Sequence, residues 1–309
     1  MTVTLTNLLV ATARQSRTTA LLVLPLLVVA SISHSQTIPA PGLYLGQNPP
    51  GTTPVIFAPG VISKGNIHSR LEISPDGQEM LWNTVDMKTF STQILSVKNV
   101  SGKWSAPQPP PFARAGNTQG AVFSPDGKKL FFSVDTGTGW VRKYVEKTAA
   151  GWSDARADGF MPGGSSSFTR SGRAYLSGEM KTKIWNTGIF GARYAADGYA
   201  DVTPLGEAIN RPNAIDYTPY VSPDESFLLF SSNRPRNGDK EDMFIHVSFR
   251  MSDGAWSTPQ RVGQIQGRFP SLSPDGKYLF FCGEDGNIYW ADKKILEPFR
   301  PVSHADSPS

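Results

Sequence analysis

Short apolar runs recur along the chain at a regular distance, and each run follows the same polar turn. The turn reads Ser-Pro-Asp-Gly or a close variant, and two to four apolar residues follow it within a few positions. Four clear copies begin at Ser74, Ser124, Ser222 and Ser273, and a degenerate copy spans residues 169–172. Aligned at the Asp position, the copies are 50, 45, 53 and 51 residues apart. A fixed period of this length indicates a repeat architecture.

Each copy of the turn predicts a β-hairpin. Pro presets φ at the second position of the turn, and Asp and Gly suit the positions after it. Apolar residues flank the turn on both sides, as two paired strands require. A Trp-Ser marker follows a further β-like run about 25 residues after the turn in three units, at residues 102–105, 151–153 and 254–257. A second hairpin therefore follows the first, and each unit contains four strands.

The repeat unit predicts the fold. Four antiparallel strands in about 50 residues are typical of a propeller blade. Five turns predict five blades, and the alternative ring of six would need a sixth turn. Residues 54–60 form an apolar strand before the first turn, whereas the last unit has only a poor outer-strand marker at residues 297–300. We therefore predict an all-β, single β-propeller of four-stranded antiparallel blades, closed by the N-terminal strand so that no edge stays exposed.

The N-terminal segment has the layout of a signal peptide. Arg14 and Arg17 precede an apolar run over residues 20–30, and Ser33-His34-Ser35 offers small residues at a cleavage site. The run is short for a membrane span, so cleavage is favoured over an uncleaved anchor, and the mature protein is expected to be periplasmic or secreted. The predicted boundaries are residues 1–35 for the signal peptide, 36–53 for a linker, 54–303 for the propeller and 304–309 for a disordered tail.

Charge and cysteine content narrow the chemistry. The formal net charge is +4, and no run of Lys or Arg concentrates it, so nucleic acid is not an expected partner. Cys282 is the single cysteine, which rules out an internal disulfide and favours a core position. His68 and His246 are too far apart to form a metal motif, and the sequence contains no nucleophile elbow or phosphate loop. We predict no catalytic residue, metal or cofactor.

The turn and the strand after it carry a resemblance to a known family. The fourth unit shows it best, in residues 205–210, in Tyr217-Thr218-Pro219-Tyr220-Val221-Ser222-Pro223-Asp224 and in residues 230–235. These segments resemble the WD40-like β-propeller repeats of TolB-like bacterial periplasmic proteins. Residues 236–242 are an acidic departure from the family's Gly-rich stretch, and the degenerate third turn lacks Pro and Asp. The resemblance implies a bacterial envelope protein that binds a partner.

The start of each innermost strand is the predicted binding surface. In a propeller these starts surround one mouth of the central channel, and the Ser-Pro-Asp-Gly turns lie on the other face. Their polar side chains include two guanidiniums, a carboxylate, an imidazole and a phenol, which could hold a sugar or peptide carboxylate. The alternative is a solvated mouth whose polar groups satisfy one another. The candidate ligand-binding residues are His68, Arg70, Gln119, Asp216, Tyr217 and Arg268.

Two classes of function fit this surface. The favoured one is a binding or scaffold protein of the cell envelope. It would act as a monomer, without a membrane span after signal cleavage, on an unidentified protein, peptidoglycan or saccharide ligand. The alternative is a carbohydrate-active hydrolase or lyase, which needs two carboxylates facing each other at the mouth. Asp216 is the only acid among the candidate residues, Glu72 lies further along its strand, and Asp86 or Glu179 would have to come from loops.

Overall fold

Strands dominate the part of the chain that the computed structural model describes, which is residues 43–158, 165–181, 187–195, 198–234 and 242–301. The signal peptide predicted over 1–35 and the tail predicted over 304–309 lie outside the described residues, as does most of the acidic departure. Three short 3₁₀ segments accompany the strands: η1 (Leu43–Gly46), η2 (Pro111–Ala113) and η3 (Lys293–Phe299).

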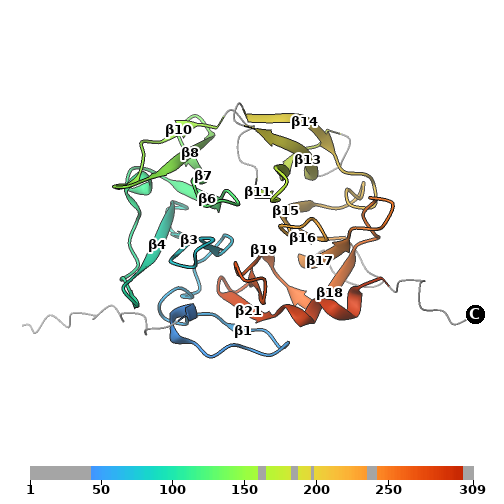
Figure 1. Cartoon of the computed structure of the whole chain (residues 1–309), viewed down its shortest axis with the longest axis horizontal. Helices are drawn as coiled ribbons and strands as arrows, with labels where there is room; N and C mark the ends of the chain where they lie inside the picture. The colour runs from blue at the N-terminus through green and yellow to red at the C-terminus, as the bar shows by residue number, and fades with distance from the viewer. Residues whose placement is uncertain (1–42, 159–164, 182–186, 196–197, 235–241, 302–309) are drawn as a thin grey trace, which may run out of the picture. The chain divides into compact units, whose positions relative to one another are not determined.

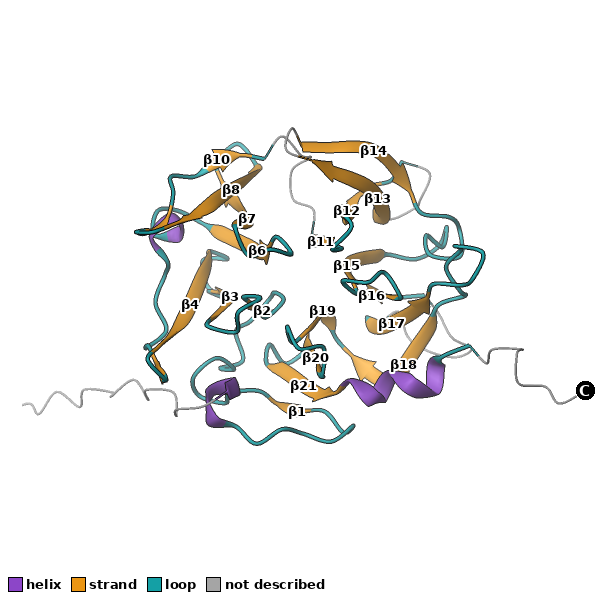
Figure 2. Ribbon diagram, viewed as in Figure 1, coloured by secondary structure: helices purple, strands orange, loops and turns teal. Residues whose placement is uncertain are grey.

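Five antiparallel sheets are arranged around a common centre, in the order of the sequence (Figures 1 and 2). This confirms the predicted five-bladed propeller. From the innermost strand outward, blade 1 contains β2 (Glu72–Ile73), β3 (Glu79–Val85), β4 (Thr92–Val100) and β5 (Lys103–Trp104), and blade 2 contains β6 (Thr118–Phe123), β7 (Lys129–Asp135) and β8 (Trp140–Thr148), to which β9 (Gly151–Trp152) and β10 (Arg156–Ala157) both pair. Blade 3 contains β11 (Ser166–Phe168), β12 (Arg173–Glu179), β13 (Thr187–Ala195) and β14 (Gly198–Pro204), and blade 4 contains β15 (Asp216–Val221), β16 (Phe227–Ser232), β17 (Phe244–Phe249) and β18 (Gln260–Gln266). Blade 5 contains β19 (Arg268–Leu272), β20 (Tyr278–Cys282), β21 (Ile288–Asp292) and β1 (Val55–Ile56).

The repeated turn joins the first two strands of each blade and uses its own polar groups. In blade 2, Ser124 Oγ donates to Asp126 Oδ1 (2.6 Å), which also accepts the backbone N–H of Lys128 (3.0 Å). The turns of blades 1 and 5 repeat this Ser–Asp bond. In the degenerate turn of blade 3, the hydroxyls of Thr169 and Ser171 lie 2.9 Å apart in its place. The Asp side chains therefore act as turn-formers.

Hydrophobic clusters fill the interfaces between neighbouring blades. Phe131 packs with Leu176 of blade 3, and Phe281 of blade 5 packs with Leu229 of blade 4. Every pair of neighbouring blades shares such a cluster. The second strand of each blade is thus covered on both faces, which explains its unbroken apolar run. The marker residue Trp256 contacts Tyr175 of the preceding blade, with ring centroids 5.8 Å apart.

The N-terminal strand closes the ring. Val55 of β1 pairs with Trp290 of β21 in antiparallel register, and the Phe57 N–H donates to Ile288 O (2.7 Å). The Ile288 N–H in turn donates to Ser63 Oγ (2.9 Å). Blade 5 is therefore built from both ends of the described chain, as predicted, and its outermost strand comes from the N-terminal side.

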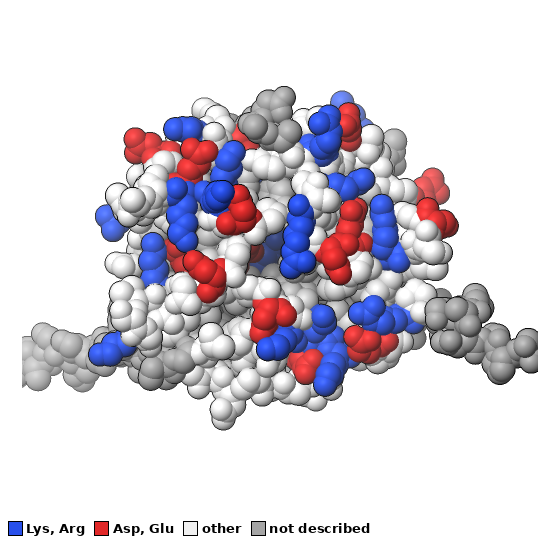
Figure 3. Space-filling model, viewed as in Figure 1, with Lys and Arg blue, Asp and Glu red and all other residues white. Residues whose placement is uncertain are grey.

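Charges of both signs are interspersed on the face of the molecule that Figure 3 shows. Some charged side chains pair between blades, such as Lys147 with Asp76 (3.2 Å). Within the described residues, no helix is long and apolar enough to span a lipid bilayer.

Candidate functional site

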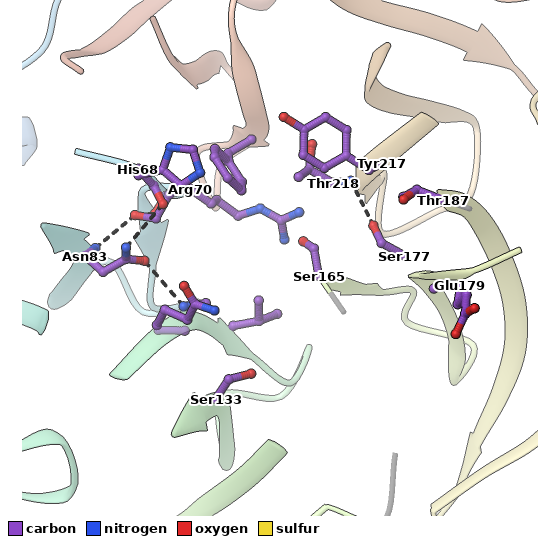
Figure 4. Close-up of a pocket in the computed structure, with 17 residues that line it drawn as sticks. His68, Arg70, Asn83, Ser133, Ser165, Ser177, Glu179, Thr187, Tyr217 and Thr218 are labelled. Carbon is purple, nitrogen blue, oxygen red and sulfur yellow. Dashed lines mark hydrogen bonds between the residues drawn. The ribbon is translucent and has the colours of Figure 1, made fainter. Parts of the chain in front are cut away.

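A cavity of about 410 Å³, which we call the funnel, opens at the mouth formed by the starts of the innermost strands. All five blades contribute to it (Figure 4). Its polar and aromatic lining consists of His68, Ser69, Arg70, Asn83, Gln119, Ser133, Ser165, Ser177, Glu179, Thr187, Tyr217, Thr218 and Phe269.

Arg70 forms the floor of the funnel. Its side chain crosses the centre of the ring, where Nη1 donates to Ser166 O of blade 3 (2.9 Å) and Nη2 donates to Pro219 O of blade 4 (2.6 Å). The residue is 6% exposed, and its Nε–H has no hydrogen-bond partner. Among the described residues, no carboxylate oxygen lies within 4.0 Å of the guanidinium. Burial lowers the pKa of this group against the opposing charge of Glu72, but an arginine stays charged at neutral pH, so the floor carries a cation without an ion-pair partner among the described residues.

β-Bulges shape the funnel wall in three blades. The register of the innermost strand shifts between Gln119 and Val122, between Tyr217 and Tyr220, and between Arg268 and Ser271. An added residue in each strand re-aims the neighbouring side chains, and bulges are common next to binding sites. The bulges hold Gly120, Thr218 and Phe269 at φ values of 68°, 54° and 57°.

Each bulge is fixed by a side chain from the preceding blade. The Gly120 N–H donates to Asn83 Oδ1 (3.3 Å), and the Thr218 N–H donates to Ser177 Oγ (2.8 Å). The Phe269 N–H donates in the same way to Ser231 Oγ (3.2 Å). These bonds compensate the left-handed backbone, which costs about 1–3 kcal/mol at a residue other than Gly. The wall is therefore preorganised by contacts between blades.

The funnel has one aromatic wall and one polar wall. On the aromatic side, Phe269 lies edge-to-face against His68 (centroids 5.1 Å apart) and against Tyr217 (6.2 Å). Loss of solvent and the charge of Arg268 lower the pKa of His68, so its ring is neutral at pH 7. Gln119, the serines and Thr187 form the opposite wall. Figure 4 shows the Arg70 guanidinium between the two walls, next to Ser165.

Four of the six predicted ligand-binding residues meet in this cavity, namely His68, Arg70, Gln119 and Tyr217. The other two do not line it. Asp216 is fully buried and accepts hydrogen bonds from Arg234 Nη2 (2.7 Å) and Ser232 Oγ (2.6 Å). Its carboxylate therefore holds the top of blade 4 together.

Arg268 lies beside the funnel. Its guanidinium pairs with Glu284 Oε2 (3.3 Å) and lines an adjoining groove between blades 5 and 1. The bulge that follows Arg268 directs Phe269 into the funnel instead.

Sequence reasoning missed Ser133 and Ser177, which lie on the second strands. Each follows the apolar run of its repeat directly, as Asn83 does in blade 1. That position ends the buried part of the strand and faces the channel mouth in blades 1, 2 and 3. The register of the repeat could therefore have identified these residues.

Carboxylates are sparse in the funnel. Glu179, an exposed side chain away from Arg70, is the one carboxylate among the described residues that line it. Glu72 lies below Arg70, where its Oε1 accepts the Phe123 N–H (2.9 Å). Burial raises the pKa of Glu72 to about 7, against the opposing effects of Arg70 and that N–H. No cluster of His, Cys, Asp and Glu able to hold a metal occurs among the described residues.

The opposite end of the channel opens between the repeated turns. This turn mouth is a hollow of about 250 Å³ that shares Arg70 with the funnel. Its rim repeats the same residue, since Pro75, Pro125, Pro223 and Pro274 line it in four blades. Arg70 therefore separates two hollows of different chemistry.

No family model matches this chain, and no curated protein matches it. Solved structures similar to it include a protein assigned as TolB from Agrobacterium tumefaciens, at 18% identity and a TM-score of 0.49, with 72% of this chain and 71% of that chain covered. TolB from Acinetobacter baumannii is 13% identical with a TM-score of 0.46, and the chain spans about half of it (72% and 54% covered).

A family 43 endo-arabinanase from Bacillus licheniformis is also similar, at 12% identity and a TM-score of 0.48, with 75% of this chain and 96% of that chain covered.

Proposed function

We propose that this chain is an exported binding protein that captures a ligand bearing an anionic group in the funnel. The observation that carries the proposal is the buried Arg70 guanidinium, which donates to two neutral carbonyls, has no ion-pair partner among the described residues and keeps one N–H unpartnered. A buried cation without a counter-charge is costly, and an anion at the same place relieves that cost. The hydroxyl and amide groups above it suit the polar remainder of such a ligand.

The cellular part of the proposal rests on the N-terminal sequence. Export by the signal segment would place the protein in the periplasm or outside the cell, where it acts as a monomer on an envelope component. A protein, peptidoglycan or saccharide that carries a carboxylate would suit the funnel. The start of the exported protein, read by N-terminal sequencing, is expected near Gln36.

Isothermal titration with matched pairs of small molecules tests the binding function. Glucuronate is compared with glucose, and N-acetylalanine with its amide, because each pair differs only in the anionic group. We expect at least one carboxylate to bind and its neutral partner to bind at least tenfold more weakly. A Gln119→Leu variant should weaken binding of the carboxylate while it leaves the unfolding temperature unchanged, since none of the described residues hydrogen-bonds to this side chain. Equal affinity within both pairs, or no binding of any carboxylate, would contradict the proposal.

The hydrolase alternative needs two carboxylates about 5–10 Å apart across a substrate. The described lining of the funnel supplies Glu179 alone. Glu72 lies on the other side of Arg70 and uses one oxygen to fix the neighbouring blade. Catalysis therefore stays a prediction without a supporting pair among the described residues.

A further inference from the structure

A second hollow adjoins the funnel over the junction of blades 5 and 1. This seam groove has a volume of about 490 Å³ and shares His68 with the funnel. The loop after β20 forms one side of it, with Glu284 and Asp285, and the loop after β3 forms the other, with Met87 and Phe90. A ligand that reaches past His68 therefore enters the groove.

The loop after β3 presents apolar side chains to solvent. Met87 is 69% exposed and Phe90 is 74% exposed. Asp86 fixes the loop, since its Oδ1 accepts the N–H of Lys88 (2.8 Å) and its backbone carbonyl accepts the N–H of Phe90 (2.7 Å). Phe90 has a φ of 55°, a conformation that an aromatic residue rarely adopts. The ordered loop thus holds the solvent-exposed Phe90 ring at the edge of the groove.

The two walls of the funnel match the two surfaces of a sugar ring. A pyranose presents an apolar face of C–H groups and a rim of hydroxyls. Tyr217 and Phe269 offer aromatic surface to the former, while Gln119 and the serines offer donors and acceptors to the latter. A carboxylate on such a ring would lie against the Arg70 guanidinium at the floor of the funnel.

A peptide strand would find few free partners on the channel side of the blades. The innermost strands could pair with an added strand only through unoccupied N–H groups. Neighbouring blades already occupy several of them, since Phe123 N–H donates to Glu72 and Val221 N–H donates to Ser167 Oγ (3.0 Å), in addition to the three bulge bonds. These N–H groups are not available to an added strand, which favours a ligand bound through its side groups.

We infer that the ligand is an acidic oligosaccharide, with one uronate unit in the funnel and the next, neutral unit in the seam groove against Phe90, because Glu284 and Asp285 line that groove. The inference rests on the proposed anion-binding function and adds the class and the length of the ligand. His68 marks the passage between the two units, because it lines both hollows.

Titration of the full mature chain with glucuronate, and with a trimer of one glucuronate and two neutral glucose units, tests this inference. We expect the trimer to bind at least tenfold more tightly than the monomer. The variant Phe90→Ser should remove most of that gain while monomer affinity and the unfolding temperature stay unchanged. The matched control is Val100→Ser, an exposed apolar side chain (67%) at the other end of the same hairpin, which should leave both affinities unchanged.

The possible results separate the inference from the function beneath it. Equal binding of monomer and trimer, or a gain that survives in Phe90→Ser, would overturn the seam groove as a subsite. Tighter binding of a peptide with a free carboxyl end, such as N-acetyl-Ala-Ala-Phe, would overturn the saccharide class while anion capture stands. A failure of every carboxylate to bind would overturn the proposed function itself.

Discussion

The two mouths of the channel differ in how their residues vary between blades. The turn mouth repeats the same residue in four blades, whereas the funnel presents different residues. At the turn mouth, four blades present the same Pro, and the adjacent Asp of each turn is engaged by its own hairpin. In the funnel, each blade presents a different side chain, from Arg70 to Gln119 to Tyr217. The hairpin turn constrains its residues because it cannot form without them. No hairpin turn depends on the residues at the starts of the innermost strands, so the side chains at these positions can vary between blades.

Replacement of Arg70 should have the largest effect on the difference in binding between the two mouths. The variant Arg70→Gln removes the charge at the funnel floor, and truncation of one partner of a buried charged contact costs about 2–5 kcal/mol of binding energy. We expect carboxylate affinity to fall at least about 30-fold, measured by titration calorimetry. Because Arg70 also ties blade 1 to blades 3 and 4, the unfolding temperature has to be recorded in parallel. Unchanged affinity in folded protein would place the anion elsewhere.

A change at the turn mouth should affect stability alone. Asp126→Ala removes the acceptor of Ser124 Oγ and of the Lys128 N–H, which we expect to cost about 1–2 kcal/mol of unfolding free energy. Chemical denaturation measures that loss, and titration should show the affinity of the funnel within twofold of the wild type. A large loss of affinity in the folded variant would mean that the turn mouth binds the ligand.

The pH dependence of binding should link the two mouths through Glu72. Its pKa of about 7 means that the carboxylate is neutral below pH 7 and ionised above it, where its charge opposes an anion at Arg70. Affinity should therefore rise as the pH falls from 8 to 6, and Glu72→Gln should flatten this rise. The pKa of His68 is lowered, so protonation of this side chain raises anion affinity only at a pH below the ordinary pKa of histidine. A wild-type profile retained in Glu72→Gln would exclude this coupling.

The same shift predicts that folding stability also falls as the pH rises. A carboxylate whose folded-state pKa is raised loses stability as the pH rises from its ordinary range near 4.3 to about 7. Glu72→Gln should therefore unfold at a higher temperature than the wild type at pH 8. The difference should vanish near pH 4, where both side chains are neutral. Calorimetric scans at the two pH values measure it.

The smallest expected effect separates two serines of the funnel. No described residue hydrogen-bonds to the Ser133 hydroxyl, so Ser133→Ala should change the unfolding free energy by less than about 0.5 kcal/mol and weaken the ligand only severalfold. Ser177 accepts the Thr218 N–H, and Ser177→Ala leaves that buried donor unsatisfied, at a cost of about 1 kcal/mol or more. Equal stability of the two variants in urea denaturation would show that the bulge does not need its side-chain acceptor.

The fold was predictable because its turns are determined by residues next to one another in the sequence. The turn residues and the unbroken apolar strands recur in every blade, so their spacing counts the blades, and the unpaired strand near residue 55 indicates the closure. The site was predictable only in part. Alternation along a strand would assign each side chain to a face, but a bulge between Tyr217 and Tyr220 changes that alternation. The roles of Asp216 and Arg268 depend on partners 16–18 residues away, at Arg234 and Glu284.

Closure by β1 ties the completion of the funnel to the synthesis of blade 5. Ser63 bonds to a residue 225 positions later, and Arg70 bonds to carbonyls 96 and 149 positions later. Residues 55–70 must therefore wait for blades 3, 4 and 5 before these contacts can form. Such long-range pairing slows folding and leaves apolar edges uncovered in the meantime. A chain that stops before blade 5 would therefore leave the funnel incomplete, because Phe269 would be missing from its wall.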